Sequence, residues 1–253
     1  MPIPQKVAQD SKALQERLRV NQKYSSKDLN EFIFSLFSLK KNAKVLDLCC
    51  GRGSQTLKFA KLCPKGTVHA WDISQESLDF IDSQKLKNVK TARVDLDAVS
   101  RMSFQENYFD LIHCAYGLYY AKDARAVIKK LYAWLKPGGS LIITGPVSGT
   151  NQELFSLMEK VYPIDPEILF SVRSFMPKIV FPTMKALFRS VQKRNFENKV
   201  TCPTPADLLP WLRSSTHYRA RYDRELRVLL EKHYAKHGRF VITKKAMSVI
   251  GVK

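Results

Sequence analysis

The sequence lacks the features that direct a protein into a membrane or an oxidising compartment. No segment approaches the roughly 18 consecutive apolar residues of a membrane-spanning helix, and the N-terminal residues lack the apolar stretch of a secretory signal. The five cysteines include no Cys-x-x-Cys pair, and an odd number of them cannot all form disulfide bonds within the chain. We therefore expect reduced thiols and a cytoplasmic location.

Acidic residues are also scarce. The chain has 42 Lys and Arg against 23 Asp and Glu, a formal net charge of +19, and the excess is heaviest in residues 151–253. A positive electrostatic field favours an acidic partner, such as a phosphorylated or carboxylated metabolite, RNA or an anionic membrane surface. A solvated basic surface without a partner is the alternative interpretation.

The rest of the composition is that of a globular protein. Of the 253 residues, 45% are hydrophobic and 11% aromatic, which provides enough apolar surface to offset the conformational entropy lost on folding. This length allows one domain with an insertion or two small domains.

Strands and helices alternate in the first part of the chain, after two helices at about 6–21 and 26–39. Apolar runs predict strands at 43–48, 67–71, 89–94, 109–114 and 140–144, with helices over 54–62, after 74 and over 123–135. Alternation at this spacing predicts a parallel sheet covered by helices on both faces.

The pattern changes after residue 146. Residues 150–200 are interrupted by prolines and predict two or three short helices, which we interpret as a helical cap inserted into the sheet fold. Further on, the pattern predicts helices at 205–212 and 225–236, a strand at 217–222, and one strand or hairpin arm over 240–252. We divide this single domain into N-terminal helices (1–42), a core (43–146), the cap (150–200) and a C-terminal completion of the sheet (201–253).

The segment VLDLCCGRGSQT, residues 45–56, joins a strand, a glycine-rich turn and a helix. This arrangement forms a nucleotide-binding crevice at the carboxyl end of a parallel sheet. Asp72 ends the next strand about 20 residues later, where a carboxylate can accept hydrogen bonds from two ribose hydroxyls. Gly51 and Gly53 could also serve a tight turn alone, but Asp72 favours the binding interpretation.

Two residues separate a dinucleotide from S-adenosylmethionine as the ligand. Thr56 stands where a pyrophosphate-binding loop has its third glycine, and an acid at Asp47 facing the loop would repel a diphosphate. S-adenosylmethionine has no phosphate and carries a sulfonium and an ammonium, which an acid beside the loop attracts. The loop therefore favours S-adenosylmethionine.

These residues resemble motif I of the class I S-adenosylmethionine-dependent methyltransferases. The similarity continues through the family's later motifs at 68–74, 95–96, 108–115 and 135–139. Five motifs in the family's order cover roughly residues 40–146, which is more specific than any one of them. The resemblance implies a Rossmann-like, doubly wound α/β sheet of about seven strands, mostly parallel with an antiparallel last strand, plus the helical cap.

The resemblance implies cofactor-binding roles for the loop and for the strand that follows it. Asp47, Gly51 and Gly53 would surround the methionine part of the cofactor, and Cys49 belongs to the same loop. Asp72 would bind the ribose.

A second group of residues would hold the adenine. Asp95 would accept a hydrogen bond from the adenine amino group, while Ile73 and Leu96 pack against the faces of the ring and Cys114 lines the floor. Asp97 lies two residues further, on the same side of an extended chain, and is the alternative to Asp95.

The sequence does not predict a metal site. No cluster of His or Cys lies near Cys49 and Cys50, and His233 and His237 have no accompanying glutamate motif, so we expect exposed helix-end residues there. The Cys-Cys-Gly sequence also occurs in some quinone-pathway C-methyltransferases. The rest of that subfamily's pattern is absent, so the resemblance stops at the superfamily.

A catalytic base is optional for this chemistry, because methyl transfer is an in-line displacement accelerated mainly by positioning in a dry site. Tyr116, in the loop after the fourth strand, is the first candidate to contact the acceptor, with Tyr119 and Tyr120 behind it. Packing under the cap is the alternative role of these tyrosines. Many relatives carry His residues near Tyr119 and Tyr120, and this chain departs from them. Tyr24 could belong to a lid over the cofactor.

The cap combines phenylalanines with basic residues, which suits an apolar ligand bearing an anion, stacked bases with phosphates, or a helix with a buried aromatic face. We predict S-adenosylmethionine-dependent methyl transfer to a small anionic or amphipathic metabolite. An RNA methyltransferase is the alternative, motivated by the net charge of +19, although the Asn/Asp-Pro-Pro signature is absent. A non-catalytic cofactor-binding scaffold is the alternative from another class.

Overall fold

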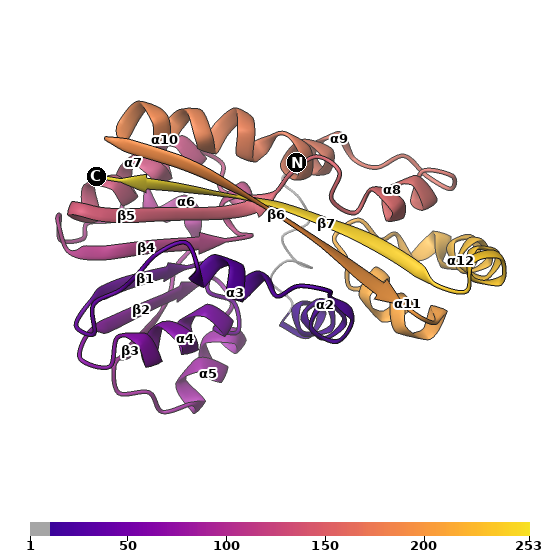
Figure 1. The fold of residues 1–253 in the computed structure, drawn as a ribbon, viewed down its shortest axis with the longest axis horizontal. Helices are drawn as coiled ribbons and strands as arrows, with labels where there is room; N and C mark the ends of the chain where they lie inside the picture. The colour runs from indigo at the N-terminus through magenta and orange to yellow at the C-terminus, as the bar shows by residue number, and fades with distance from the viewer. Residues whose placement is uncertain (1–10) are drawn as a thin grey trace. The chain divides into compact units, whose positions relative to one another are not determined.

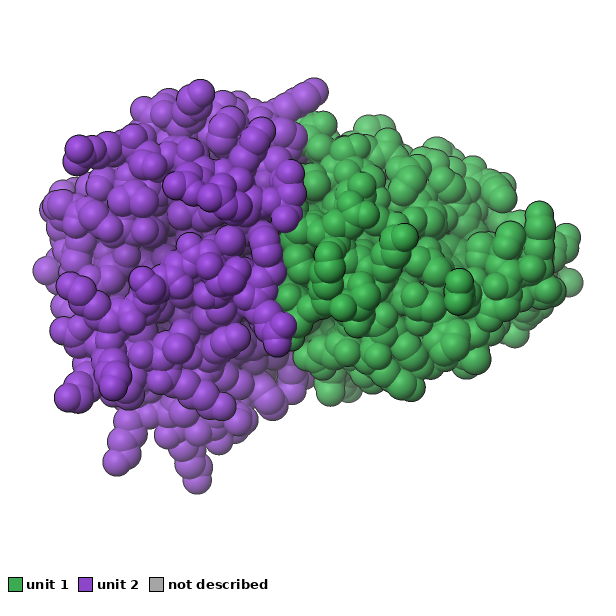
Figure 2. Space-filling model, in the orientation of Figure 1, with its two compact units in different colours: residues 1–29, 146–174, 196–246 green, residues 30–145, 175–195, 247–253 purple. Residues whose placement is uncertain are grey.

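The computed structural model describes residues 11–253, and the chain divides into two compact units (Figure 2). Unit 1 comprises the residues up to Leu29, Pro146–Ser174 and Phe196–Ala246. Unit 2 comprises Asn30–Gly145, Phe175–Asn195 and Met247–Lys253. This partition does not follow the boundaries that we drew at 42, 146 and 200, so the division into core, cap and completion stays a prediction.

A seven-stranded sheet carries the fold, with the strand order β3-β2-β1-β4-β5-β7-β6 (Figure 1). The strands are β1 (Lys44–Leu48), β2 (Thr67–Asp72), β3 (Val89–Arg93), β4 (Phe109–Ala115), β5 (Leu135–Pro146), β6 (Ser190–Cys202) and β7 (Phe240–Val252). Neighbouring strands from β3 to β5 pair in parallel. The order reverses direction at β1, which is where open α/β sheets bind their ligands.

The last strand, β7, runs antiparallel to β5. The Lys253 amide donates to the Gly139 carbonyl at 3.0 Å, and the Thr144 and Ser248 hydroxyls are 2.7 Å apart. Residue numbers thus rise along one strand as they fall along its neighbour, as antiparallel pairing requires. The predicted doubly wound sheet with an antiparallel last strand is confirmed.

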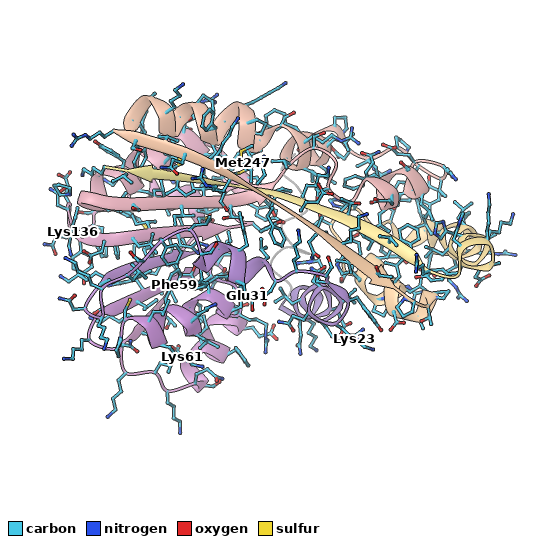
Figure 3. All side chains as sticks on the ribbon, viewed as in Figure 1. Lys23, Glu31, Phe59, Lys61, Lys136 and Met247 are labelled. Carbon is cyan, nitrogen blue, oxygen red and sulfur yellow. The ribbon has the colours of Figure 1, made fainter. Side chains whose placement is uncertain are left out.

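The central strands are buried because helices cover both faces of the sheet. Four of the five residues of β1 and residues 111–114 of β4 are buried, which explains their almost continuous apolar sequences. The connecting helices are α4 (Ser54–Leu62), α5 (Gln75–Ser83), α6 (Leu96–Val99) and α7 (Ala124–Trp134). Phe59 of α4, labelled in Figure 3, belongs to a core cluster with Val45 and Leu111.

The N-terminal helices differ from the prediction. The predicted helix at about 6–21 lies partly outside the described residues, and α2 covers Ser11–Tyr24. The second helix, α3, is only Leu29–Phe34, although we predicted 26–39. Phe37 and Leu39 follow the helix and pack against the core cluster. The spacing of these apolar residues resembles that of a longer helix. An irregular segment can give the same spacing, because it also buries its apolar side chains.

The predicted cap is helical only in its first part. It contains α8 (Gln152–Met158), α9 (Pro166–Arg173), a π-helical turn at Met176–Val180 and α10 (Phe181–Leu187). The helical prediction for residues 190–200 is wrong, because they belong to strand β6 at the edge of the sheet. Only Phe196, Asn198, Val200 and Cys202 alternate as buried residues. The polar first half of the strand concealed its period of two.

The remaining helices lie between β6 and β7. They are α11 (Pro205–Arg213), a 3₁₀ turn at Ala220–Tyr222 and α12 (Asp223–His237). The strand predicted at 217–222 is wrong, because its last three residues form this 3₁₀ turn. The Tyr222 ring stacks on the Tyr162 ring, with the ring centres 4.9 Å apart. None of the helices in the described part of the chain has the length and apolar character needed to cross a membrane.

Candidate functional site

The turn between β1 and α4 has an unusual backbone. Cys49, Gly51 and Gly53 all adopt the left-handed conformation, with φ of 58°, 51° and 76°. A Cβ at Gly53 would also lie 2.7 Å from the side chain of Ile81, so this glycine is needed for space as well as for conformation. Cys49 adopts the same region at a steric cost, and such strain is concentrated at functional sites.

Asp72 holds this turn in place from the end of β2. Its carboxylate accepts hydrogen bonds from the Gly51 amide at 2.8 Å and the Ser74 amide at 2.9 Å. Burial raises the pKa of Asp72, and these hydrogen bonds act in the opposite direction. The carboxylate thus lies beside the turn, where the ribose-binding prediction requires it.

Both carboxylate oxygens of Asp47 have hydrogen-bond partners within the protein. Its side chain is only 1% exposed and accepts a hydrogen bond from Thr56 Oγ1 at 2.5 Å. Its other oxygen lies 2.9 Å from His113 Nδ1 on β4. The buried carboxylate therefore joins β1, α4 and β4, and its contact with the methionine part of the cofactor stays a prediction.

Sequence reasoning missed two partners of this carboxylate. We noted Thr56 only as the residue that replaces a third glycine, and the sequence pattern did not point to His113. The signal available in the sequence is an acid in the centre of a buried strand, because a buried carboxylate needs hydrogen-bond donors from neighbouring elements.

The loop after β4 lies directly against the glycine turn. A Cβ at Gly117 would be 2.3 Å from the Cys49 Cβ and 3.6 Å from the Cys114 sulfur. A hydrogen bond with Cys114, followed by burial, raises the pKa of the Cys49 thiol well above its usual range. The Cys49 thiol is therefore a small neutral packing group here, and Gly117, which packs against it, is a residue that we did not predict for the site.

The residues predicted to hold the adenine lie after β2 and β3. Asp95 is exposed and caps α6, where its carboxylate accepts from the Asp97 amide at 2.9 Å. Asp97 forms an ion pair with Lys122 at 3.2 Å and also accepts from the Lys122 amide. Leu96 is buried, and the carbonyl of Ile73 accepts from an arginine side chain. Because Asp97 is already paired with Lys122, Asp95 remains the better candidate to bind the adenine amino group. This role of Asp95 stays a prediction.

Tyr116 follows β4 in the left-handed conformation, with φ of 55°, and its amide donates to the Thr144 carbonyl at 2.8 Å. The side chain is 37% exposed, the only exposed large aromatic side chain of unit 2 among the described residues. Desolvation raises the pKa of its hydroxyl even though part of the residue is exposed. The phenol is therefore protonated at neutral pH and suited to donate a hydrogen bond rather than to act as a base.

Tyr119 and Tyr120 form a 3₁₀ turn with Leu118, and their ring centres are 4.7 Å apart. The Tyr119 ring also meets Phe175 edge to face at 6.1 Å. These contacts support the packing role that we considered for the two tyrosines.

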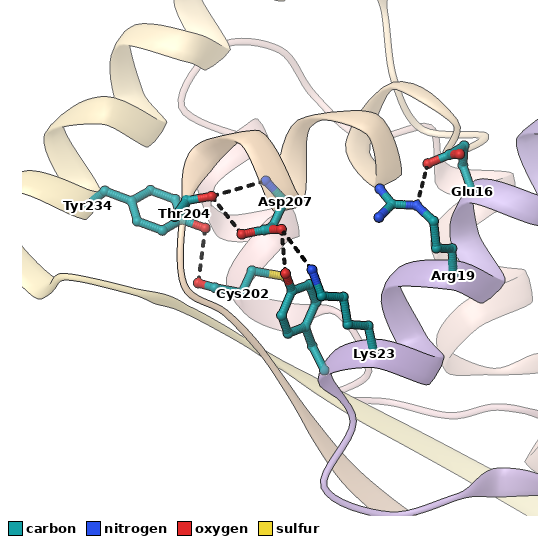
Figure 4. A network of polar contacts seen from close by, with 8 residues as sticks. Glu16, Arg19, Lys23, Cys202, Thr204, Asp207 and Tyr234 are labelled. Carbon is teal, nitrogen blue, oxygen red and sulfur yellow. Dashed lines mark hydrogen bonds and ion pairs between the residues drawn. The ribbon is translucent and has the colours of Figure 1, made fainter.

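Tyr24, the predicted lid residue, is a hydrogen-bond partner of Asp207, which is labelled in the polar network of unit 1 in Figure 4. Its hydroxyl donates to the carboxylate of Asp207, which also accepts from Thr204 Oγ1 at 2.6 Å and lies 3.9 Å from the ammonium of Lys23. Thr204 caps α11, so the network joins α2 to the start of that helix.

Most of the aromatic residues in the predicted cap serve the core. Phe170 is 43% exposed, whereas four of the six phenylalanines between 150 and 200 are buried, namely Phe155, Phe175, Phe188 and Phe196. In the part of the chain that the structure describes, no three His, Cys, Asp or Glu side chains are grouped as metal ligands would be.

Known proteins resemble this part of the chain in sequence. Residues 45–139 match the model of a methyltransferase domain. The chain is 33% identical over 108 residues to a demethylmenaquinone methyltransferase of a Geobacillus species, covering 42% of this chain and 46% of the relative. It is 34% identical over 113 residues to a ubiquinone/menaquinone biosynthesis C-methyltransferase of Neisseria meningitidis, covering 44% and 46%. The chain thus spans about half the length of these curated relatives.

Solved structures support the same fold over most of the chain. A putative methyltransferase from Bacillus halodurans superposes with a TM-score of 0.64 at 15% identity, covering 89% of this chain and 98% of that chain. The YcgJ protein of Bacillus subtilis superposes with a TM-score of 0.62 at 16% identity, covering 88% and 97%. The methyltransferase-domain match of residues 45–139 and the fold shared with these structures agree with the resemblance to class I S-adenosylmethionine-dependent methyltransferases seen in the motifs.

Proposed function

We propose that the protein transfers a methyl group from S-adenosylmethionine to a small molecule. The observation that carries this proposal is the left-handed glycine turn held by the Asp72 carboxylate within a methyltransferase domain. Neighbouring side chains leave no room for a Cβ at Gly53 in the turn or at Gly117 in the loop after β4, so both positions require glycine. No phosphate-binding third glycine is present, which favours a ligand without a diphosphate.

In this proposal, residues at or just after the carboxyl ends of β1, β2 and β3 hold the cofactor. The backbone around Gly51 and Gly53 contacts the methionine part, Asp72 accepts from the ribose hydroxyls, and Asp95 accepts from the adenine amino group. Asp47 acts indirectly, because Thr56 and His113 already occupy its carboxylate and so fix the start of α4. When bound, S-adenosylmethionine supplies an electrophilic methyl group.

The chain offers positioning rather than strong acid–base groups for the transfer. Tyr116 is a protonated hydrogen-bond donor beside the turn, and the Cys49 thiol is protonated as well. An in-line displacement needs the acceptor atom at attack distance in a site that excludes water, and positioning alone can supply a large part of the rate. We therefore assign Tyr116 to the orientation of the acceptor and not to proton removal.

We propose a small anionic or amphipathic molecule as the acceptor. Two observations support it: the relatives described above are named for quinone methylation, and the chain carries a formal charge of +19. A reduced quinone ring is the apolar acceptor to test, and an aromatic carboxylate is the anionic one. RNA remains the second candidate because the same positive charge would attract a polyanion.

The test is transfer of a labelled methyl group from S-adenosylmethionine to each candidate class in parallel. We expect turnover with a reduced quinone or an aromatic carboxylate, and a reduced rate for Tyr116→Phe without loss of cofactor affinity. Tyr132→Phe, outside the site, is the matched control. Methylation of RNA alone would replace the small-molecule assignment, and unchanged turnover in Tyr116→Phe would assign that residue to packing.

A further inference from the structure

The chain segments that precede β1, β2 and β3 form a positively charged surface within unit 2. Because these three strands are parallel and adjacent, the segments before them lie at the same edge of the sheet, at the amino ends of the strands. Residues 40–42, 61–65 and 84–88 make up this amino-edge surface. The glycine turn follows the carboxyl end of β1, so the proposed cofactor site lies at the other edge.

Hydrogen bonds join the three segments to one another. The Lys65 amide donates to the Lys41 carbonyl at 2.9 Å, which joins the segment before β2 to the segment before β1. The Asn88 side-chain amide donates to the carbonyls of Ala60 and Cys63 at 2.8 and 2.9 Å, which fixes the segment before β3 against the end of α4. The charges that these segments carry therefore lie on one continuous part of the molecule.

Every charged residue of the amino-edge surface is a lysine, and all of these lysines are exposed: Lys40, Lys41, Lys61, Lys65, Lys85 and Lys87. Among the residues that the structure describes, no carboxylate forms an ion pair with any of the six. Asp82, the acid that comes just before the third segment, accepts instead from the Thr91 hydroxyl at 2.9 Å. The lysines repel one another, and a surface of opposite charge would offset that repulsion.

One apolar side chain lies among these lysines. Leu62 is 43% exposed, and in the described part of unit 2 it is the only exposed large aliphatic side chain. It follows Lys61, labelled in Figure 3, at the end of α4, and the next residue, Cys63, is buried. Cations around an exposed aliphatic side chain suit an anionic lipid surface, where ammonium groups contact the head groups and the apolar side chain enters the interface.

The composition of the amino-edge surface favours lipid over nucleic acid. Its three segments contain no aromatic residue and no arginine. They therefore lack the aromatic rings on which bases stack and the guanidinium groups that bind a phosphate through two parallel hydrogen bonds.

We propose that the amino-edge surface binds the surface of an anionic lipid membrane. The six ammonium groups contact the anionic head groups, and Leu62 inserts between them. Binding is reversible and weakens with salt, because salt screens exposed charges. The inference does not rest on the proposed function, because the surface shares no residue with the proposed cofactor site.

Co-sedimentation of the full chain with lipid vesicles tests the proposal. The vesicles consist of phosphatidylcholine alone or of phosphatidylcholine with about 30% phosphatidylserine. We expect binding to the anionic vesicles, which about 1 M salt abolishes, and little binding to the neutral ones. Each lysine near an anionic bilayer changes the affinity about fivefold, so Lys61→Gln/Lys65→Gln/Lys85→Gln should weaken binding at least about tenfold. Leu62→Gln keeps every charge and should also weaken binding, by about threefold.

The matched control is Lys160→Gln/Lys232→Gln/Lys236→Gln. This variant removes three exposed lysines of unit 1 and therefore lowers the net charge by the same amount. We expect it to bind the anionic vesicles like the wild type, because attraction to the membrane depends on where the lysines lie and not on the net charge alone.

Three results would overturn the proposal: no binding to the anionic vesicles, equal losses in the two triple variants, or wild-type affinity in Leu62→Gln. If the first triple variant does not fold, Lys40→Gln/Lys41→Gln/Lys87→Gln, which replaces the other three lysines, must show the loss instead. A single-stranded RNA oligonucleotide is titrated in parallel. RNA binding that depends on the same lysines, without binding to vesicles, would assign the surface to nucleic acid and contradict the proposal.

Discussion

At the scale of single residues, the site depends on backbone positions that tolerate little change. Asp72 fixes the Gly51 amide, and Gly117 leaves space for Cys49. Each of these interactions joins a loop to the end of a different strand. Substitutions here should therefore change cofactor affinity or loop stability more than the same substitutions on the surface.

We predict that Asp72→Ala weakens S-adenosylmethionine binding by about 1–3 kcal/mol, because it removes hydrogen bonds to a charged group. Calorimetric titration measures the affinity. Asp79→Ala is the control, because Asp79 is exposed on α5 and accepts a hydrogen bond from Gln75 of the same helix at 2.8 Å. Equal affinity of folded Asp72→Ala and wild type would remove the ribose assignment.

We predict that Gly117→Ala destabilises the protein by about 1–3 kcal/mol, because the new Cβ would be 2.3 Å from the Cys49 Cβ. The double variant Cys49→Gly/Gly117→Ala should recover most of the loss, since it removes the clashing atoms and the strained left-handed cysteine. Urea unfolding measures both. Additive effects of the two substitutions would contradict the direct contact.

At the scale of elements, the β1–α4–β4 junction shows what the sequence predicted and what it did not. The alternating strands and helices of residues 43–146 were predictable, because parallel strands and amphipathic helices have different periods. The hydrogen-bond partners of Asp47 were not predictable, because Thr56 and His113 lie on separate elements, α4 and β4. Strand β6 was missed for a related reason: its first residues are exposed and polar, so only pairing with β7 identifies it.

We predict that Thr56→Val lowers the free energy of unfolding by about 1–3 kcal/mol, because it leaves one oxygen of a buried carboxylate without its donor. Thr91→Val is the matched control. It removes a similar hydrogen bond to Asp82 in an exposed position, where water replaces the donor. Urea unfolding of both variants checks the prediction, and equal losses would show that burial of Asp47 is unimportant.

At the scale of the whole molecule, charge and burial determine the response to pH. Burial, with Lys90 and Lys44, lowers the pKa of His69 to about 4, well below the ordinary value of 6.5. The unfolded chain therefore binds a proton at this histidine before the folded protein does. The stability contributed by the neutral ring is present above pH 6.5 and is lost as the pH falls toward 4.

We predict that His69→Phe loses less stability than the wild type between pH 6.5 and 4, because phenylalanine does not take up a proton in the unfolded state. Phenylalanine also suits the site, where the His69 ring meets Phe104 and Phe109 edge to face. Urea midpoints across this pH range measure the effect. Parallel curves for both proteins would contradict burial as the cause of the shift.

The residues that match the methyltransferase domain, 45–139, contain the glycine turn, Asp72 and Asp95, to which we assign the cofactor. The acceptor stays a proposal. The cytoplasmic location and RNA as an alternative partner stay predictions from composition.

The most direct test of the central claim is calorimetric titration of the full chain with S-adenosylmethionine and, separately, with NADH, after bound nucleic acid has been excluded by absorbance. The account predicts saturable micromolar binding of S-adenosylmethionine and none of NADH, because the turn lacks a diphosphate-binding third glycine and is held by Asp72. Binding of NADH alone, or of neither ligand by folded protein, would contradict it.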